Sequence, residues 1–380
     1  MKKAYNQTWI EHMYIQSTAS EWVSKNLLTK EQEAEVKEVF EEKFYRPGIF
    51  VKIGLFFFAV IACSFFVGFV SLFFYDTGSE VGFSLLSLIC CACFTFFLEH
   101  LIKTNKLFHS GIDNALLYAA VTAAMVPVFL LFENADTWFY CLLGLAILVP
   151  VILRYADLLA VIVAFGLLFL FMSSLMVKFP LGKALLPFGI MALSAAVYFF
   201  ARKIRSIYYT ACRNILEILA LVTFYLGGNY LVVREGNAMM NDLSAAIAPQ
   251  ISFAPLFYFF TLAIPAFYIV AGLKKGNRIL LVIGLLAFAF SVHTYFNYFS
   301  PVTGSQLLAG GGMLMIILAV GLIRYLHTPK HGISDEQEGK RKFGDLEAIL
   351  IAQKLGQTPA ESGLEFGGGE FGGGGAGEVY

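Results

Sequence analysis

The chain has 380 residues, of which 58% are hydrophobic and only 14% are charged, with 27 basic and 27 acidic side chains. A water-soluble protein carries about 25% charged residues. The composition therefore excludes a soluble globular enzyme, a secreted disulfide-rich scaffold and a nucleic-acid-binding protein, and it predicts an integral membrane protein.

Residues 1–47 are polar and predict a cytoplasmic segment of short helices. Thr29-Lys30-Glu31-Gln32 matches the helix-start pattern T-x-x-Q. Apolar side chains recur on both sides of this pattern: Trp22, Val23, Leu27 and Leu28 before it, and Val36, Val39, Phe40 and Phe44 behind it. We expect a helical hairpin that acts as a small lid or stabilising element. The alternative is a module that docks a protein partner.

Residues 48–325 contain ten apolar segments that are each long enough to predict a membrane-spanning helix. They cover residues 48–75, 81–98, 115–132, 138–153, 158–177, 184–200, 212–233, 251–272, 279–299 and 305–323. The expected fold class is an all-α polytopic transmembrane bundle of about ten helices with short connections.

The distribution of Lys and Arg predicts the orientation of this bundle. If the N-terminus is cytoplasmic, 24 of the 27 basic residues fall on cytoplasmic segments, and only Lys178, Lys183 and Arg234 fall outside. Cytoplasmic loops of membrane proteins carry such an excess of positive charge. We therefore expect both termini to be cytoplasmic.

The chain becomes polar again after the last apolar segment. Residues 326–362 predict a cytoplasmic tail, in which residues 345–355 form a short amphipathic helix suited to the membrane surface. Residues 363–380 are rich in glycine and are expected to be disordered.

One candidate site is a charge pair within the seventh apolar segment. Arg213 and Glu217 are four residues apart, so they share one face of a helix. One interpretation is a self-neutralising pair near the inner membrane interface. The other is a proton or substrate-charge site at Glu217, because ionisable groups inside a bilayer are costly and are candidates for function.

A second candidate site is a polar pocket between the ninth and tenth segments. Its residues share a similar expected depth in the membrane: His293, Asn297, Gln306, Gly310, Gly311 and Gly312. Adjacent glycines permit the local unwinding that transporters use at binding sites. The alternative is close helix packing with interhelical hydrogen bonds.

The sequence contains no motif for nucleotide hydrolysis or for a metalloprotease, and we expect Cys90 and Cys93, which form a C-x-x-C pattern without further ligands, to be buried thiols. The chain contains neither the phosphate-binding pattern G-x-x-x-x-G-K-[ST] nor H-E-x-x-H, and its six histidines are scattered. We therefore do not expect an enzyme, and we assign no catalytic residue, metal site or cofactor.

The segment from Trp22-Val23 through Leu27-Leu28 to Thr29-Lys30-Glu31-Gln32, followed by a glycine-containing first span, resembles an uncharacterised family of bacterial membrane proteins. That family carries a domain of unknown function, with N-terminal cytoplasmic helices followed by multiple transmembrane helices. The resemblance covers residues 1–75 and implies a bacterial inner membrane, but it implies no activity, ligand or catalytic residue.

Two functions remain open from the sequence. The first is a transporter-like protein for a small molecule or lipid. The second is a non-transporting scaffold or sensor that binds partners through its cytoplasmic ends. In both, the lipid bilayer is a partner, a protein partner is expected at the N-terminal hairpin or the C-terminal tail, and no nucleic acid is bound.

Overall fold

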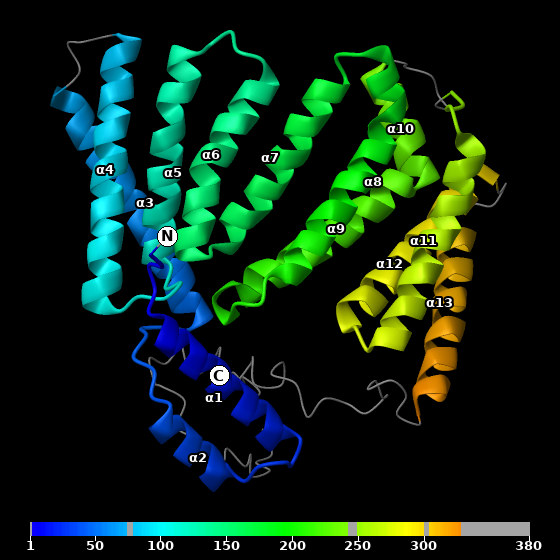
Figure 1. Ribbon diagram of the computed structural model, residues 1–380, viewed down its shortest axis with the longest axis horizontal. Helices are drawn as coiled ribbons and strands as arrows, with labels where there is room; N and C mark the ends of the chain where they lie inside the picture. Colours follow the sequence, from blue (N-terminus) through cyan, green and yellow to red (C-terminus); the bar gives the residue numbers. More distant parts are fainter. Residues whose placement is uncertain (1, 74–78, 242–248, 300–303, 328–380) are drawn as a thin grey trace, which may run out of the picture. The chain divides into compact units, whose positions relative to one another are not determined.

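The computed structural model describes residues 2–73, 79–241, 249–299 and 304–327 (Figure 1). The regular elements in these residues are helices, and the β feature found there is an isolated bridge between Tyr45 and Leu107. The predicted all-α class is therefore confirmed. The predicted amphipathic helix at 345–355 and the glycine-rich tail at 363–380 lie outside the described residues.

The N-terminal segment forms two helices, α1 (Gln7–Ser24) and α2 (Lys30–Val39), which contact each other. The capping box predicted from the sequence is present: the Thr29 hydroxyl accepts a hydrogen bond from the Gln32 backbone N–H, and the Gln32 side chain accepts one from the Thr29 N–H. Polar contacts also join this hairpin. The Gln16 amide donates to the Phe40 carbonyl at 2.7 Å.

The apolar segments form long helices whose bounds lie close to the predicted ones. They are α3 (Ile49–Ser71), α4 (Glu80–Asn105), α5 (Ile112–Leu131), α6 (Thr137–Tyr155), α7 (Leu158–Met176), α8 (Pro180–Lys203), α9 (Thr210–Gly228), α11 (Ala254–Lys275), α12 (Arg278–Phe299) and α13 (Gly304–Leu326). Among the described residues, nine helices are long and apolar enough to cross a membrane, and α13 carries a shorter apolar stretch, Ala309–Tyr325.

The outer surface of these helices is apolar. On α3, for example, the Phe58 side chain is 71% exposed and that of Phe65 is 76% exposed. Large contiguous apolar surfaces of this kind are not stable in water. The chain is therefore a multi-pass membrane protein whose helices contact the lipid bilayer.

Successive helices pack most closely in the pairs α4–α5, α6–α7, α8–α9 and α11–α12, and α9 also contacts α7, α11 and α12. Small residues permit this close packing. A Cβ atom at Gly272 would lie 2.8 Å from the backbone nitrogen of Leu281, so α11 and α12 approach each other at that point more closely than a side chain would permit.

The seventh apolar segment differs from its prediction. It was expected to run through residues 212–233, but α9 ends at Gly228, and a separate helix, α10 (Tyr230–Met240), begins after Asn229. The Asn229 side chain accepts a hydrogen bond from the Val232 N–H, which caps the new helix. It also bonds to the Tyr225 hydroxyl at 2.9 Å and to Thr294 Oγ1 at 3.0 Å. The hydrogen bonds of the buried Asn229 side chain therefore stabilise the break between α9 and α10.

Candidate functional site

The loop between α4 and α5 is organised around a buried carboxylate, that of Asp113. This carboxylate accepts hydrogen bonds from the backbone N–H groups of His109 at 2.7 Å and Ser110 at 2.8 Å, and from the Ser110 hydroxyl at 3.0 Å. Gly111 has φ +104°, and a Cβ atom there would lie 2.3 Å from the Lys52 carbonyl oxygen. Only glycine therefore lets the loop pass this close to the first turn of α3.

The segment before α1 is tied to the same carboxylate. The Tyr5 hydroxyl donates a hydrogen bond of 2.9 Å to Asp113 Oδ2, and both side chains are buried. Burial, reinforced by the neighbouring Asp113 carboxylate, raises the pKa of Tyr5 well above its ordinary value. The phenol is therefore a permanent donor at neutral pH.

A second buried carboxylate, that of Asp157, lies at the start of α7. Asp157 accepts a hydrogen bond from the Ala160 N–H at 2.9 Å and so caps the helix. It also accepts bonds from Asn114 Nδ2 at 2.9 Å and from the Tyr118 hydroxyl at 3.0 Å. These bonds join α5 to α7.

His109 and Asn114 meet between the two carboxylates. Asn114 Nδ2 lies 3.3 Å from His109 Nδ1, and because the amide nitrogen donates, Nδ1 accepts and the ring proton resides on Nε2. Burial lowers the pKa of His109 below its ordinary value of 6.5, although Asp113 and Asp157 favour the charged form. His109 is therefore neutral at neutral pH.

The amide oxygen of Asn114 has no hydrogen-bond partner among the residues that the structure describes, although Asn114 is only 9% exposed. Its identity as oxygen follows from chemistry, because the other amide atom must donate to the Asp157 carboxylate. A buried acceptor without a partner is unfavourable by about 1–3 kcal/mol. The Asn114 oxygen is therefore an unsatisfied acceptor that almost no solvent-accessible surface exposes, and a bound donor would reach it only after the side chain rotates.

Tyr5, His109, Asn114 and Asp157 line one cavity of about 1070 Å³, here called the Asn114 cavity. Its lining comes from the N-terminal segment and α1, the start of α3, the start of α5, the start of α7, and the short helix η2 (Ile207–Tyr209) with the start of α9. The Lys52 side chain lines it and forms no hydrogen bond or ion pair with the described residues. Apolar residues line much of the remaining wall.

One side of the Asn114 cavity faces the lipid-exposed surface. Among its lining residues, Ile49 and Phe57 on α3 are 61% and 60% exposed, and Leu158 and Ile162 on α7 are also exposed. The site therefore combines a polar floor, an apolar wall and the Lys52 cation, which has no ion-pair partner in the described ranges. Together these can hold an amphiphilic molecule with a polar head and an apolar tail.

Comparison with known proteins returns no match: no family model, no curated protein and no solved structure matches the chain. Within the described residues, no group of three or more His, Cys, Asp or Glu side chains is placed to hold a metal ion.

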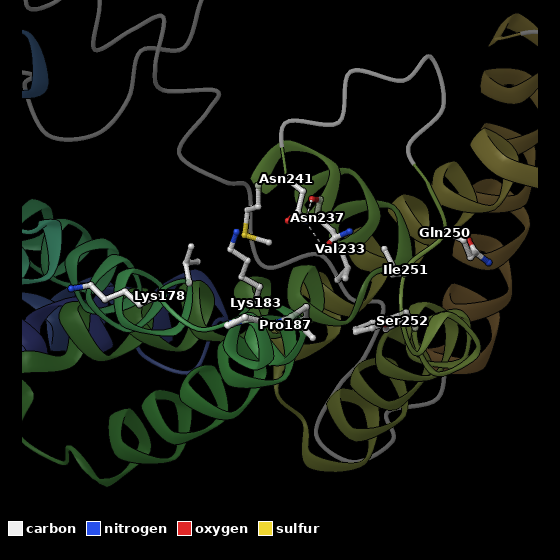
Figure 2. Close-up of a pocket in the computed structure, with 14 residues that line it drawn as sticks. Lys178, Lys183, Pro187, Val233, Asn237, Asn241, Gln250, Ile251 and Ser252 are labelled. Atoms are coloured by element: carbon white, nitrogen blue, oxygen red, sulfur yellow. Dashed lines mark hydrogen bonds between the residues drawn. The ribbon is translucent and has the colours of Figure 1, made fainter.

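A second cavity, of about 580 Å³, lies at the opposite end of α7 (Figure 2). Its lining includes Lys178, Lys183, Asn237 and Gln250. Figure 2 shows Lys178 directed away from its centre; the Lys178 ammonium forms an ion pair of 2.7 Å with Asp136. Hydrogen bonds from Lys178 and Trp138 lower the pKa of the exposed Asp136.

The predicted charge pair lies on α9. Arg213 Nε and Glu217 Oε1 are 3.8 Å apart, and Glu217 is buried. The sequence spacing thus places the two groups together as a pair; whether Glu217 handles protons or substrate remains a prediction.

The residues of the predicted polar pocket are distributed over the surfaces of α12 and α13. His293, Asn297 and Gln306 are exposed. A Cβ atom at Gly311 would lie 3.8 Å from Val292, whereas one at Gly310 or Gly312 would meet nothing within 4 Å. The cavities described above take no lining residue from this set.

Hydropathy did not indicate Asn114 and Asp157, which line the Asn114 cavity, or Asp113, which holds the adjoining loop. All three lie just outside the predicted spans 115–132 and 158–177, so they were not considered as groups buried at the membrane boundary. One signal was available: an aspartate directly before an apolar helix, as at Asp157, is typical of a helix N-cap.

Proposed function

We propose that this protein is a transporter-like protein of a bacterial inner membrane that binds a lipid or other amphiphilic small molecule in the Asn114 cavity. The observation that carries the proposal is a cavity with an apolar, exposed wall that is lined by Asn114, whose buried oxygen has no hydrogen-bond partner among the described residues. A hydroxyl or ammonium group of the bound molecule would satisfy this acceptor.

The charge in the cavity defines the ligand further. Within the described part of the chain the Lys52 ammonium has no ion-pair partner, so it favours an anionic group such as a phosphate. Asn114 requires a donor, and the exposed residues of α3 and α7 accommodate an apolar chain. A glycerophospholipid with a hydroxyl- or ammonium-bearing head has all three features.

The expected orientation supports access from the cytoplasmic leaflet. The Asn114 cavity lies beside α1, and the excess of basic residues predicts that this end of the bundle is cytoplasmic. The resemblance of residues 1–75 to bacterial membrane proteins supports a location in a bacterial inner membrane.

The proposal is tested by lipid retention. Full-length protein is purified in mild detergent, and bound phospholipid is quantified by native mass spectrometry during titration with phosphatidylethanolamine. We expect Asn114→Ala and Lys52→Gln each to weaken binding about fivefold to tenfold, because each removes one polar contact. Asn297→Ala is the matched control, since Asn297 is exposed on α12. Equal binding by the Asn114 and Lys52 variants and the wild type would refute the proposal.

Transport, as distinct from binding, requires a further measurement. In reconstituted vesicles, movement of a head-labelled phospholipid between leaflets should be faster with wild-type protein than with Asn114→Ala. Binding without any acceleration would favour the second candidate, a scaffold or sensor.

The scaffold or sensor alternative is favoured by the surface of the hairpin. Trp22, Leu27 and Val39 are 48%, 67% and 72% exposed although they lie outside the membrane-spanning helices. If this surface binds a protein partner, Trp22→Ala with Leu27→Ala should abolish co-purification of that partner while lipid retention by the Asn114 cavity is unchanged.

A further inference from the structure

A third cavity, here called the basic cleft, lies beside Tyr5 and has a volume of about 390 Å³. Its charged lining residues are Lys2, Lys3, Lys103, Lys106, Arg154 and Glu99. Five cationic side chains thus share a small cleft with one carboxylate, and their mutual repulsion is unfavourable unless an anion is present.

The cleft is assembled from three parts of the chain. Lys103 lies in the last turn of α4, with Lys106 directly after the helix, and Arg154 lies in the last turn of α6. The segment before α1 is fixed against α6, because the Ala4 N–H donates to the Arg154 carbonyl at 3.0 Å and the Arg154 guanidinium donates to the Lys2 carbonyl at 2.8 Å. These bonds hold Lys2 and Lys3 beside the ends of two spanning helices.

Internal contacts neutralise only part of this charge. Glu99 accepts a hydrogen bond of 2.6 Å from Arg154 Nε, and the Lys103 ammonium lies 3.9 Å from the other oxygen of Glu99. Lys3 lies over the Tyr208 ring, and Lys106 lies over the Trp9 ring. An aromatic ring attracts a cation but does not cancel its charge.

Helix dipoles account for only some of the five cationic residues in the basic cleft. The negative C-terminal ends of α4 and α6 favour Lys103 and Arg154. Lys2 and Lys3 precede α1 and belong to neither helix end. The Lys2 ammonium contacts no carboxylate among the described residues, so the cleft keeps a net positive charge.

We infer that the basic cleft binds the phosphate of an anionic phospholipid headgroup. The cleft lies where α4 and α6 end, which is the depth of the headgroups, and basic pockets at this depth bind acidic lipids. Trp9 lines the cleft, as amphipathic rings do at membrane interfaces. The basic cleft and the Asn114 cavity share Tyr5 as a lining residue, but their charged groups differ, and this inference does not depend on the function proposed for the Asn114 cavity.

The test uses full-length protein in mild detergent, titrated with phosphatidylglycerol, with phosphatidylcholine as the zwitterionic reference. Retained lipid is measured by native mass spectrometry. We expect Lys2→Gln with Lys103→Gln to weaken retention of phosphatidylglycerol about 25-fold, or about fivefold for each charge removed. The matched control, Lys274→Gln with Lys275→Gln, removes two charges from the end of α11 and should leave retention unchanged.

Two further arms separate the alternatives. The same 25-fold loss in a Lys52→Gln background would support the basic cleft as an independent site, whereas no loss in that background would assign the lipid to the Asn114 cavity and overturn the inference. Millimolar inorganic phosphate that binds as tightly as phosphatidylglycerol would also overturn it in favour of a free anion. Equal loss in the Lys274 and Lys275 control would show a nonspecific charge effect and would count against the cleft.

Discussion

The hydroxyl of Tyr5 donates a hydrogen bond of 2.9 Å to the carboxylate of Asp113, which lies 108 residues further along the chain. This bond joins the segment before α1 to the loop that precedes α5. The same loop carries His109 to the Asn114 cavity, and the first turn of α5 carries Asn114 there. The N-terminal hairpin and the proposed binding site are therefore parts of one connected structure.

Removal of this bond should destabilise the cytoplasmic end of the bundle. In Tyr5→Phe, the buried Asp113 carboxylate loses one donor, which we expect to lower the free energy of unfolding by about 1–3 kcal/mol. The measurement is the thermal unfolding midpoint in detergent. Tyr14→Phe is the control, because Tyr14 lies on α1 and is exposed. An unchanged midpoint in Tyr5→Phe would show that the bond contributes nothing.

Gly111 should not tolerate a side chain. Gly111→Ala places a Cβ atom against the Lys52 carbonyl and forces an unfavourable positive φ, so we expect a loss of at least about 2 kcal/mol. Gly166→Ala on α7 meets nothing within 4 Å and should be tolerated. If the two variants unfold at the same temperature, the described approach of the loop to α3 is wrong.

His109 should make stability depend on pH. Its folded pKa lies below the unfolded value of 6.5, so the unfolded chain binds more protons between these two values. The stability that neutral His109 contributes is present above pH 6.5 and decreases as pH falls through this window toward the folded pKa. His109→Gln should remove that part of the decrease. The control, His100→Gln at an exposed position on α4, should lose stability with falling pH as the wild type does.

Asn229 should be required for the break between α9 and α10. Asn229→Ala removes hydrogen bonds to Tyr225 and Thr294 and the cap on Val232, and we expect a loss of about 2 kcal/mol. Asn237→Ala, on the next turns of α10, is the control. The measurement is the thermal unfolding midpoint in detergent, and an unchanged midpoint in Asn229→Ala would contradict this role of the side chain.

The membrane helices could be predicted from the sequence because their formation depends on long apolar runs. α7 was expected at 158–177 and lies at Leu158–Met176. The break at Asn229 could not be predicted from hydropathy, since residues on both sides are apolar and the interruption depends on partners on α12. Gly227-Gly228-Asn229 was the available local signal.

The candidate site was harder to predict for a related reason. Asp113 and Asp157 lie at the ends of apolar segments, where a charge is usually solvated, and only tertiary contacts bury them. His293 and Asn297 were chosen as polar residues in an apolar helix. However, the buried polar side chains of α12 are Ser291 and Thr294, on the face that contacts α9. The sequence does not show which helices lie next to α12, so it could not indicate which face of α12 is buried.

The most direct test of the central claim is photo-crosslinking from the wall of the Asn114 cavity in native membranes. A photoreactive amino acid replaces Ile162, which lines the cavity, or Leu170, which lies on the same helix, is exposed and does not line it. We predict that the crosslinker at 162 captures a restricted class of phospholipid and that Asn114→Ala with Lys52→Gln abolishes this selection, while the crosslinker at 170 captures lipids in proportion to their abundance. The same lipid profile at both positions, unaffected by these substitutions, would contradict binding in the cavity.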